Sequence, residues 1–311
     1  MNMLYIIGNG FDLWHGLPTS YKCFNCYIHR THPREHEIIG HIFNHMDPND
    51  LWSDFENKLG TPDIGSLVDY ICNKEAKKCV EKSLDNVFFS LKDLFKEWVE
   101  QIPMLVFNNR FLKLDKRALF LNFNYTNTLE RLYNIDSGRI CYIHGNTKNN
   151  KLCNPVFGHR GCDNFVENNK RLICDKLSSN TRVSPCEIIN GIKDFYDSLA
   201  KEPKIISRKS ERDEYGHPDN YYIFQNKNFF NNVNGCSDIY VLGHSLNEID
   251  TPYFVRIYAS SPNATWHVSC YDEKEKKNNK QKLCDLLAVS QKNINIELFE
   301  LDDLELKKEN C

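Results

Sequence analysis

The stretch that decides the fold of this 311-residue chain is Leu4–Asp12, LYIIGNGFD. Its first four residues are apolar without alternation, as in a strand buried on both faces, and they run directly into Gly8-Asn9-Gly10. Glycines at such a turn let the backbone bend tightly and approach a phosphate or a ribose. The third glycine of the GxGxxG dinucleotide motif is missing, so the turn alone does not identify a ligand.

Further apolar runs rich in Ile, Val, Leu and Tyr follow along the chain. Between them lie helical patterns, of which the clearest is the stripe from Leu84 to Ile102 that Pro103 ends. Strands that alternate with helices predict an α/β fold: a mostly parallel, Rossmann-like sheet with helices on both faces. The further strands are expected at Ala118–Phe123, Ile140–Ile143, Pro155–Phe157, Ile239–Leu242, Thr265–Cys270 and Ile294–Phe299.

Two long stretches, approximately 20–110 and 160–235, contain few strand patterns. The first is helical in pattern, and the second holds a predicted helix at Cys186–Leu199 between polar loops. We expect both to be helical insertions in a single domain that spans residues 1–311. They would form a cap over the edge of the sheet.

Composition excludes several classes of protein. The chain is 41% hydrophobic with a formal net charge of −3, so bulk charge attracts it neither to nucleic acid nor to an anionic membrane. It has no apolar run of the roughly 20 residues that a membrane span needs, and its first residues lack the basic start of a signal peptide. Its 13 cysteines are scattered, which favours free thiols over a disulfide framework. We therefore expect a cytoplasmic protein.

Polar residues stand where several of the predicted strands end. Asn122 and Asn124 follow the second strand, with Thr126 or Asn127 placed to cap the next helix, and His144 follows the third strand. The same pattern recurs at Phe157–Gly161 (FGHRG) and at Gly243–Leu246 (GHSL), after which Asp250 opens a helix. Ligands of open α/β sheets bind at the carboxyl ends of the strands, so these residues are expected to surround one site.

Two other groups of residues invite a metal or acid–base interpretation. His36 and His41 nearly spell the zincin motif, but a spacing of five places their imidazoles about 140° apart on a helix, so no metal is expected. In Trp52–Glu56 (WSDFE) the aromatic residues are expected in the core. Asp54 and Glu56 are compatible with a solvated helix or with a place facing the cleft.

In this order the motifs resemble the bacteriophage abortive-infection family AbiH, and through it, more distantly, the sirtuin-like NAD-hydrolase domains of phage-defence effectors. The resemblance implies NAD as substrate, with no metal, and Asn124 and His144 as the catalytic pair. Thr126 stands where the sirtuin-like pattern has Asp. The matching motifs are IGNGFD at Ile7–Asp12, GLPTSY at Gly16–Tyr21, WSDFE at Trp52–Glu56, FNYT at Phe123–Thr126, IHG at Ile143–Gly145, FGH at Phe157–His159, and GHSL at Gly243–Leu246 with Asp250.

The resemblance also implies a set of residues that bind the nucleotide. Asn9 and Asp12 would bind the adenosine ribose or base, and Ser245 with the Gly243 and His244 amides would bind phosphate. The full implied set is Gly8, Asn9, Gly10, Phe11, Asp12, Tyr125, Gly145, Gly243, His244, Ser245 and Asp250.

Two other functions remain open on the sequence. One is a sensor that holds NAD or ADP-ribose without hydrolysing it, because the same residues would predict it. The other is a nuclease that attacks host nucleic acid, for which the chain lacks a basic surface pattern. A homo-oligomer and a phage-derived trigger are expected by resemblance alone.

Overall fold

The computed structural model describes residues 3–43, 93–102, 110–148, 151–153, 165–177 and 226–306, with single residues and short stretches at 47, 51, 55–58, 63, 65–66, 68–69, 91, 189–190 and 193. The chain divides into two compact units. The sheet unit comprises Met1–Thr19, Ile102–Pro155 and Pro203–Cys311, and the helical unit comprises Ser20–Gln101 and Val156–Glu202. The single domain with insertions at 20–110 and 160–235 stays a prediction.

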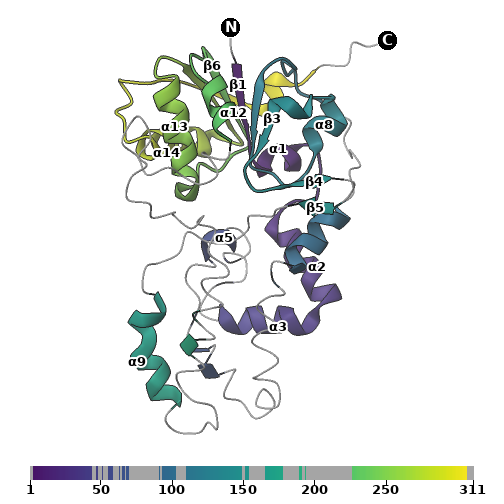
Figure 1. The fold of residues 1–311 in the computed structure, drawn as a ribbon, viewed down its shortest axis with the longest axis vertical. Helices are drawn as coiled ribbons and strands as arrows, with labels where there is room; N and C mark the ends of the chain where they lie inside the picture. Colours follow the sequence, from purple (N-terminus) through teal and green to yellow (C-terminus); the bar gives the residue numbers. More distant parts are fainter. Residues whose placement is uncertain are drawn as a thin grey trace. The chain divides into compact units, whose positions relative to one another are not determined.

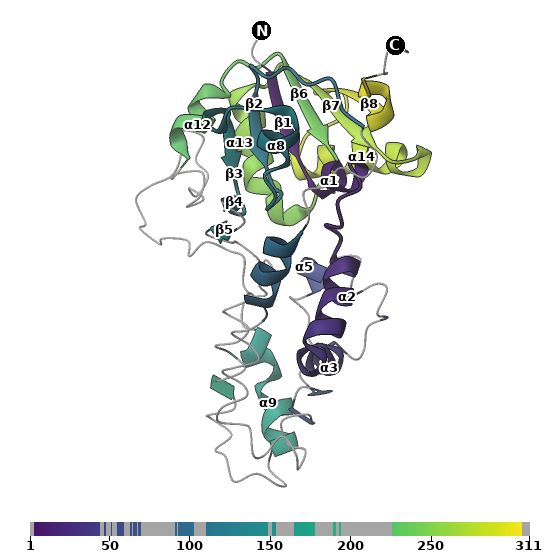
Figure 2. The same ribbon diagram turned by 90° about the vertical axis from the view of Figure 1, so that its right-hand side faces the viewer.

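The sheet unit is built on a six-stranded sheet in which every pair of neighbouring strands is parallel. The strand order β3-β2-β1-β6-β7-β8 corresponds, when these strands are renumbered, to the 3-2-1-4-5-6 order of doubly wound folds (Figure 2). The predicted parallel Rossmann-like sheet is therefore confirmed. The strands are β1 (Met3–Ile7), β2 (Leu119–Asn122), β3 (Ile140–Tyr142), β6 (Asp238–Leu242), β7 (Thr265–Cys270) and β8 (Asn295–Glu300).

Each of these six strands falls on a predicted apolar run. The strand predicted at Pro155–Phe157 lies outside the described residues. A short antiparallel hairpin of β4 (Asn146–Lys148) and β5 (Lys151–Cys153) was not predicted, because its sequence is polar and lacks the apolar pattern of a buried strand.

Helices cover both faces of the sheet, as predicted (Figure 1). On one face lie α1 (Asn9–Trp14) and α8 (Thr128–Tyr133), and on the other lie α12 (Lys227–Asn232), α13 (Thr251–Ser260) and α14 (Glu273–Leu286). Short 3-10 turns occur at Ser137–Arg139, Glu248–Asp250 and Leu301–Leu304. Among the residues described, no helix is both long and apolar enough to cross a bilayer.

A row of rings crosses the α1 face of the sheet in strict register. Phe120, Tyr5, Tyr240 and His267 are cross-strand neighbours, with successive ring centroids 5.1, 5.2 and 4.2 Å apart. The row ends at His267, which lies between carboxylates of both neighbouring strands. Its Nε2 is 3.0 Å from Asp238 Oδ1, and its Nδ1 is 3.0 Å from Glu297 Oε2. These pairs fix the register of the strands on which the site depends.

The helical unit has an aromatic core. Its described helices are α2 (Tyr21–Thr31), α3 (Pro33–Ile42), α5 (Phe55–Lys58), residues 93–101 and α9 (Phe165–Leu177). The Phe24 ring packs against Phe55, Phe95 and Trp98 at centroid distances of 6.2, 5.4 and 5.1 Å. This confirms the predicted stripe over its described part and the core position of Phe55. Trp52, Asp54 and the Glu56 side chain lie outside the described part of the structure.

The turn after β1 (Gly8–Gly10) and the turn after β6 (Gly243) meet at the topological switch point of the sheet, between β1 and β6. The Gly10 amide donates to the Gly243 carbonyl at 2.7 Å, and the Gly8 amide donates to Leu242 at 2.9 Å. A Cβ on Gly8 would lie 2.5 Å from the His244 Cα, and a Cβ on Gly10 would lie 2.8 Å from the Gly243 Cα. The glycines therefore allow the two turns to touch each other, which is a structural reason for them besides ligand approach.

Gly243→Ala tests this contact. Gly243 has a φ of 63°, and a Cβ there would lie 2.1 Å from the Phe11 nitrogen. Gly235→Ala is the matched control, because Gly235 has a φ of 73° with nothing within 4 Å of the added carbon. In urea denaturation we expect Gly235→Ala to cost about 1–2 kcal/mol and Gly243→Ala to cost more than about 4 kcal/mol. Equal costs would show that the turns do not need their close contact.

Candidate active site

Two buried polar clusters lie at the carboxyl edge of the sheet, one packed toward each face. The aspartate cluster consists of Asp12, Asn124, Thr126 and Thr128 and lies between α1 and the segment that leads into α8. The histidine cluster consists of His144, His244 and Asp250 and lies at the start of α13.

The aspartate cluster surrounds a carboxylate that is 1% exposed. The Thr126 hydroxyl donates to Asp12 Oδ2, and the Thr128 hydroxyl lies 2.8 Å from Asp12 Oδ1. The Asn124 side chain also hydrogen-bonds Asp12, and its Nδ2 donates to the Gly8 carbonyl at 3.0 Å. Through these bonds α1 holds the whole segment that follows β2.

Burial raises the pKa of Asp12 to about 6, although the bonds from Thr126, Thr128 and Asn124 lower it. The sequence predicted that Thr126 or Asn127 caps the next helix. Asn127 does occupy the N-cap position of α8, but its side chain makes no capping bond. Capping as the reason for Thr126 is wrong, because its hydroxyl donates to the buried carboxylate instead.

The histidine cluster places one carboxylate between two imidazoles that come from different strands. Asp250 Oδ1 lies 3.8 Å from His144 Nε2, and Asp250 Oδ2 lies 3.5 Å from His244 Nε2. The three residues are only 5% (His144), 7% (His244) and 6% (Asp250) exposed. Asp250 stands at the N-cap of α13, as predicted, but its side chain makes no capping bond there.

The backbone bonds of the two imidazoles assign their protons. A carbonyl only accepts, so His144 Nδ1 carries a proton that it donates to the Phe123 carbonyl at 3.1 Å. An amide N–H only donates, so His244 Nδ1 accepts from Leu246 at 3.0 Å and its proton is on Nε2, toward Asp250. In a neutral His144 the lone pair is therefore on Nε2, the ring nitrogen nearer to Asp250.

An apolar ring separates the two imidazoles. The Phe123 ring lies edge-on to both, with centroid distances of 5.4 Å to His144 and 4.6 Å to His244. The Tyr125 ring lies on His144 at 5.8 Å and is half-buried. These rings place apolar surface against both imidazoles, and an apolar surrounding strengthens the electrostatic interactions between buried polar groups.

The remaining predicted residues line the turns around the clusters. Asn9 and Ser245 are exposed, with Asn9 Nδ2 donating to the Thr19 carbonyl at 3.0 Å, and Gly145 has a φ of 88°. The Gly243 amide, expected to bind phosphate, already donates to Ser269 Oγ at 2.8 Å. The Phe11 side chain is in the core.

The predicted catalytic pair is divided between the two clusters. Asn124 belongs with Asp12 on the α1 side, and His144 belongs with Asp250 on the α13 side, although both follow neighbouring strands. Their joint action in catalysis stays a prediction. His159 and its neighbours lie outside the described residues.

Sequence reasoning missed the two threonines of the aspartate cluster. Thr126 and Thr128 were not recognised as partners of Asp12, although a Thr-x-Thr spacing that follows a strand is the pattern that could have revealed them. In the part of the chain that the structure describes, no group of three His, Cys, Asp or Glu side chains is placed to hold a metal.

The sheet is open and all its strands are parallel, and the polar clusters lie beside its switch point. These features place the protein in the class of Rossmann-like α/β proteins, with a candidate site at the carboxyl edge of the sheet. The chain belongs to the bacteriophage abortive infection AbiH family, whose family model matches residues 4–270. It therefore has a role in abortive infection by phage. The match extends from β1 to the end of β7. Searches of curated proteins and of solved structures found no match.

Asp12→Asn tests the raised pKa of the buried carboxylate, because the substitution removes its titration. Because the folded-state pKa is raised, the folded protein binds more protons than the unfolded chain between pH 3.8 and about 6. The contribution of Asp12 to stability is therefore lost as the pH rises through this window. We expect the free energy of unfolding of Asp12→Asn, relative to the parent, to rise by up to about 3 kcal/mol from pH 4 to pH 7.

Urea denaturation at several pH values measures this difference. Asp136→Asn, at an exposed aspartate outside the cluster, is the matched control for the loss of a carboxylate that accepts a backbone bond, here from the Gly138 amide. A constant difference between Asp12→Asn and the parent across the range would contradict the assignment.

Proposed function

We propose that this protein is an effector of abortive infection that binds NAD and hydrolyses its nicotinamide–ribose bond. The observation that carries the proposal is the buried pair of His144 and Asp250, at the edge of the sheet where open α/β folds bind nucleotides. Loss of NAD would stop the metabolism of an infected cell before phage could multiply. We expect the protein to act in the cytoplasm, where this substrate is available.

The proposed chemistry follows from the assigned protons. Cleavage of the nicotinamide–ribose bond develops positive charge at the anomeric carbon, and removal of a proton from a ribose hydroxyl would stabilise it. His144 Nε2 would accept that proton, and Asp250, at 3.8 Å, would stabilise the imidazolium that forms. Nicotinamide would leave as a neutral base as the C–N bond breaks. The water that adds to the anomeric carbon would return a proton to the ribose oxygen, and His144 would release its proton to solvent. Nδ1 keeps the ring oriented through its bond to Phe123.

Asn124 would position the attacking water. Its side-chain nitrogen donates to the Gly8 carbonyl, and its side-chain amide also forms a hydrogen bond with Asp12. Its Oδ1 atom would then accept a bond from water. Asp12 would support this arrangement by holding the amide in place.

The two glycine turns would hold the rest of the nucleotide. Asn9 and Ser245 are exposed on the turns that meet at the switch point, where they would bind a ribose hydroxyl and a phosphate oxygen. A homo-oligomer and a phage-derived trigger belong to the same proposal, on resemblance to such effectors alone.

Nicotinamide release from NAD tests the proposal. We expect the purified parent to release nicotinamide and His144→Ala to release it at least about 100-fold more slowly, because a general base contributes that much or more. His41→Ala is the matched control, since His41 is an exposed histidine of α3. Circular dichroism would show that each variant is folded.

Two results would contradict the proposal. His144→Ala that releases nicotinamide as fast as the parent would remove His144 from the mechanism. A parent that releases none, yet gains thermal stability with NAD, would be a sensor that binds the nucleotide without hydrolysing it.

A further inference from the structure

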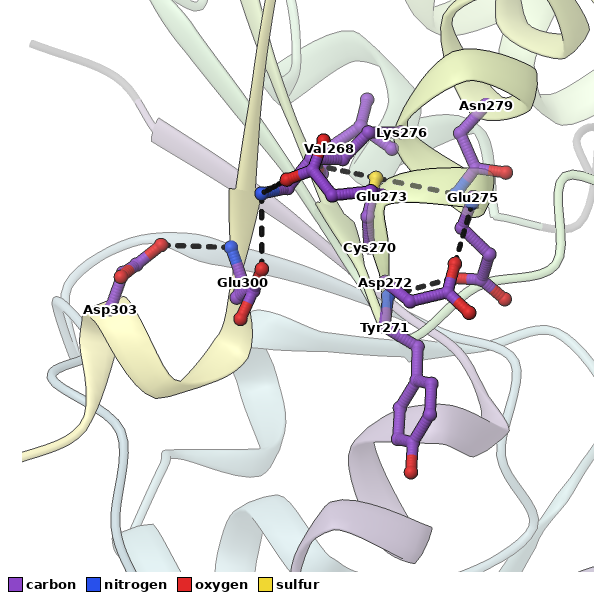
Figure 3. A network of polar contacts seen from close by, with 10 residues as sticks. All are labelled: Val268, Cys270, Tyr271, Asp272, Glu273, Glu275, Lys276, Asn279, Glu300 and Asp303. Carbon is purple, nitrogen blue, oxygen red and sulfur yellow. Dashed lines mark hydrogen bonds and ion pairs between the residues drawn. The ribbon is translucent and has the colours of Figure 1, made fainter.

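Tyr271 is the most exposed large hydrophobic side chain that the structure describes. It is 89% exposed, against 52% for Leu306 and 43% for Leu13 and Leu172. It comes directly after β7, at the carboxyl edge of the sheet that also carries the candidate site. Figure 3 shows its ring extending away from the polar network around it.

The backbone that carries this ring is held firmly. The Tyr271 amide donates to Glu275 Oε2 at 2.8 Å, and the Glu275 amide donates to Asp272 Oδ1 at 2.8 Å as α14 begins (Figure 3). The preceding residue, Cys270, accepts a bond from Asn279 Nδ2 at 3.6 Å. The exposed ring therefore projects from a fixed strand end rather than from a loose loop.

Tyr271 also lies on the opposite side of the switch point from His144. The strand order places β7 four strands away from β3, which is about 19 Å at the usual strand spacing. The bond from the Gly243 amide to Ser269 Oγ joins the end of β7 directly to the turn after β6. A dinucleotide that lies across the edge has one half on each side of such a switch point.

The charges beside Tyr271 favour a base over a phosphate. Asp272, Glu273 and Glu275 open α14, and Glu300 ends β8 close by, with Lys276 bound to both Glu273 and Glu300 at 2.7 and 3.0 Å. Asp272 and Glu275, which bind each other and the Tyr271 amide, disfavour a phosphate group at the ring, although Lys274 and Lys277 lie in the same turns of α14. A neutral base can stack its face on the Tyr271 ring and can donate hydrogen bonds from its amino group to the carboxylates.

We propose that Tyr271 is the stacking platform for the adenine base of the bound nucleotide, and this assignment rests on the proposed function. If the ribose next to nicotinamide lies at His144, the adenine half extends across the turns after β1 and β6 toward β7. Stacking on an exposed aromatic ring at a fixed strand end would set the affinity for the base. The bond-breaking step would take place at the other end of the site.

AMP, which carries the base but no bond to nicotinamide, is the probe that separates the two proposals. By calorimetry we expect Tyr271→Ala to weaken AMP binding by about 5- to 100-fold, and Tyr271→Phe to retain it. In NAD hydrolysis the same loss would raise KM and leave kcat unchanged. Leu306→Ala, at an exposed apolar residue after the last 3-10 turn, is the matched control and should bind AMP like the parent.

The outcomes are distinguishable. AMP binding that depends on Tyr271 in a protein that releases no nicotinamide would support the platform and contradict the hydrolysis. Hydrolysis of NAD with the same KM in Tyr271→Ala and the parent would overturn the platform and leave the proposed function intact. A parent that does not bind AMP would also overturn the platform.

Discussion

The close contact between the turns after β1 and β6 is the constraint on which the candidate site depends. Gly8 and Gly10 press against the backbone of Gly243 and His244 at distances that admit no side chain, and two backbone hydrogen bonds join the turns. This contact fixes α1 on one face of the sheet and the start of α13 on the other. Each polar cluster is then built against one of these helices, with Asp12 on α1 and Asp250 at the N-cap of α13.

The two buried carboxylates are stabilised by different means, and this difference separates their roles. Among the described residues Asp12 has hydroxyl and amide partners but no cation, so burial dominates and its pKa is raised. Asp250 instead faces two imidazoles, each able to carry positive charge. A carboxylate held by neutral donors acts as a structural tie, whereas a carboxylate beside a basic imidazole supports proton transfer. In the proposed function, the chemistry would therefore lie on the His144 side and the support for Asn124 on the Asp12 side.

Much of the fold could be predicted because continuous apolar runs ending in Gly, Asn or His are a local property of the sequence. These runs predicted the six strands of the sheet and their parallel arrangement. Helical spacing of apolar residues predicted the buried stripe that contains Phe95 and Trp98. The partners of Asp12 could not be predicted, because Thr126 and Thr128 are more than 100 residues away along the chain and only the β1–β2 pairing brings them together. For the same reason the sequence placed Asn124 and His144 at one edge but did not show that they join different clusters. The sequence also could not show that Gly8 and Gly10 allow the turn after β1 to pack against the turn after β6, because this contact depends on the pairing of β1 with β6.

In the proposed function, the two clusters would face one ligand from opposite sides of the sheet edge. The most direct test is a crystal structure of the folded His144→Ala variant with NAD bound. We expect the ribose next to nicotinamide to lie between Asn124 and the Cβ of residue 144, with Asp250 within about 4 Å of a ribose hydroxyl. NAD bound elsewhere, or a ribose in contact with neither Asn124 nor Asp250, would contradict it.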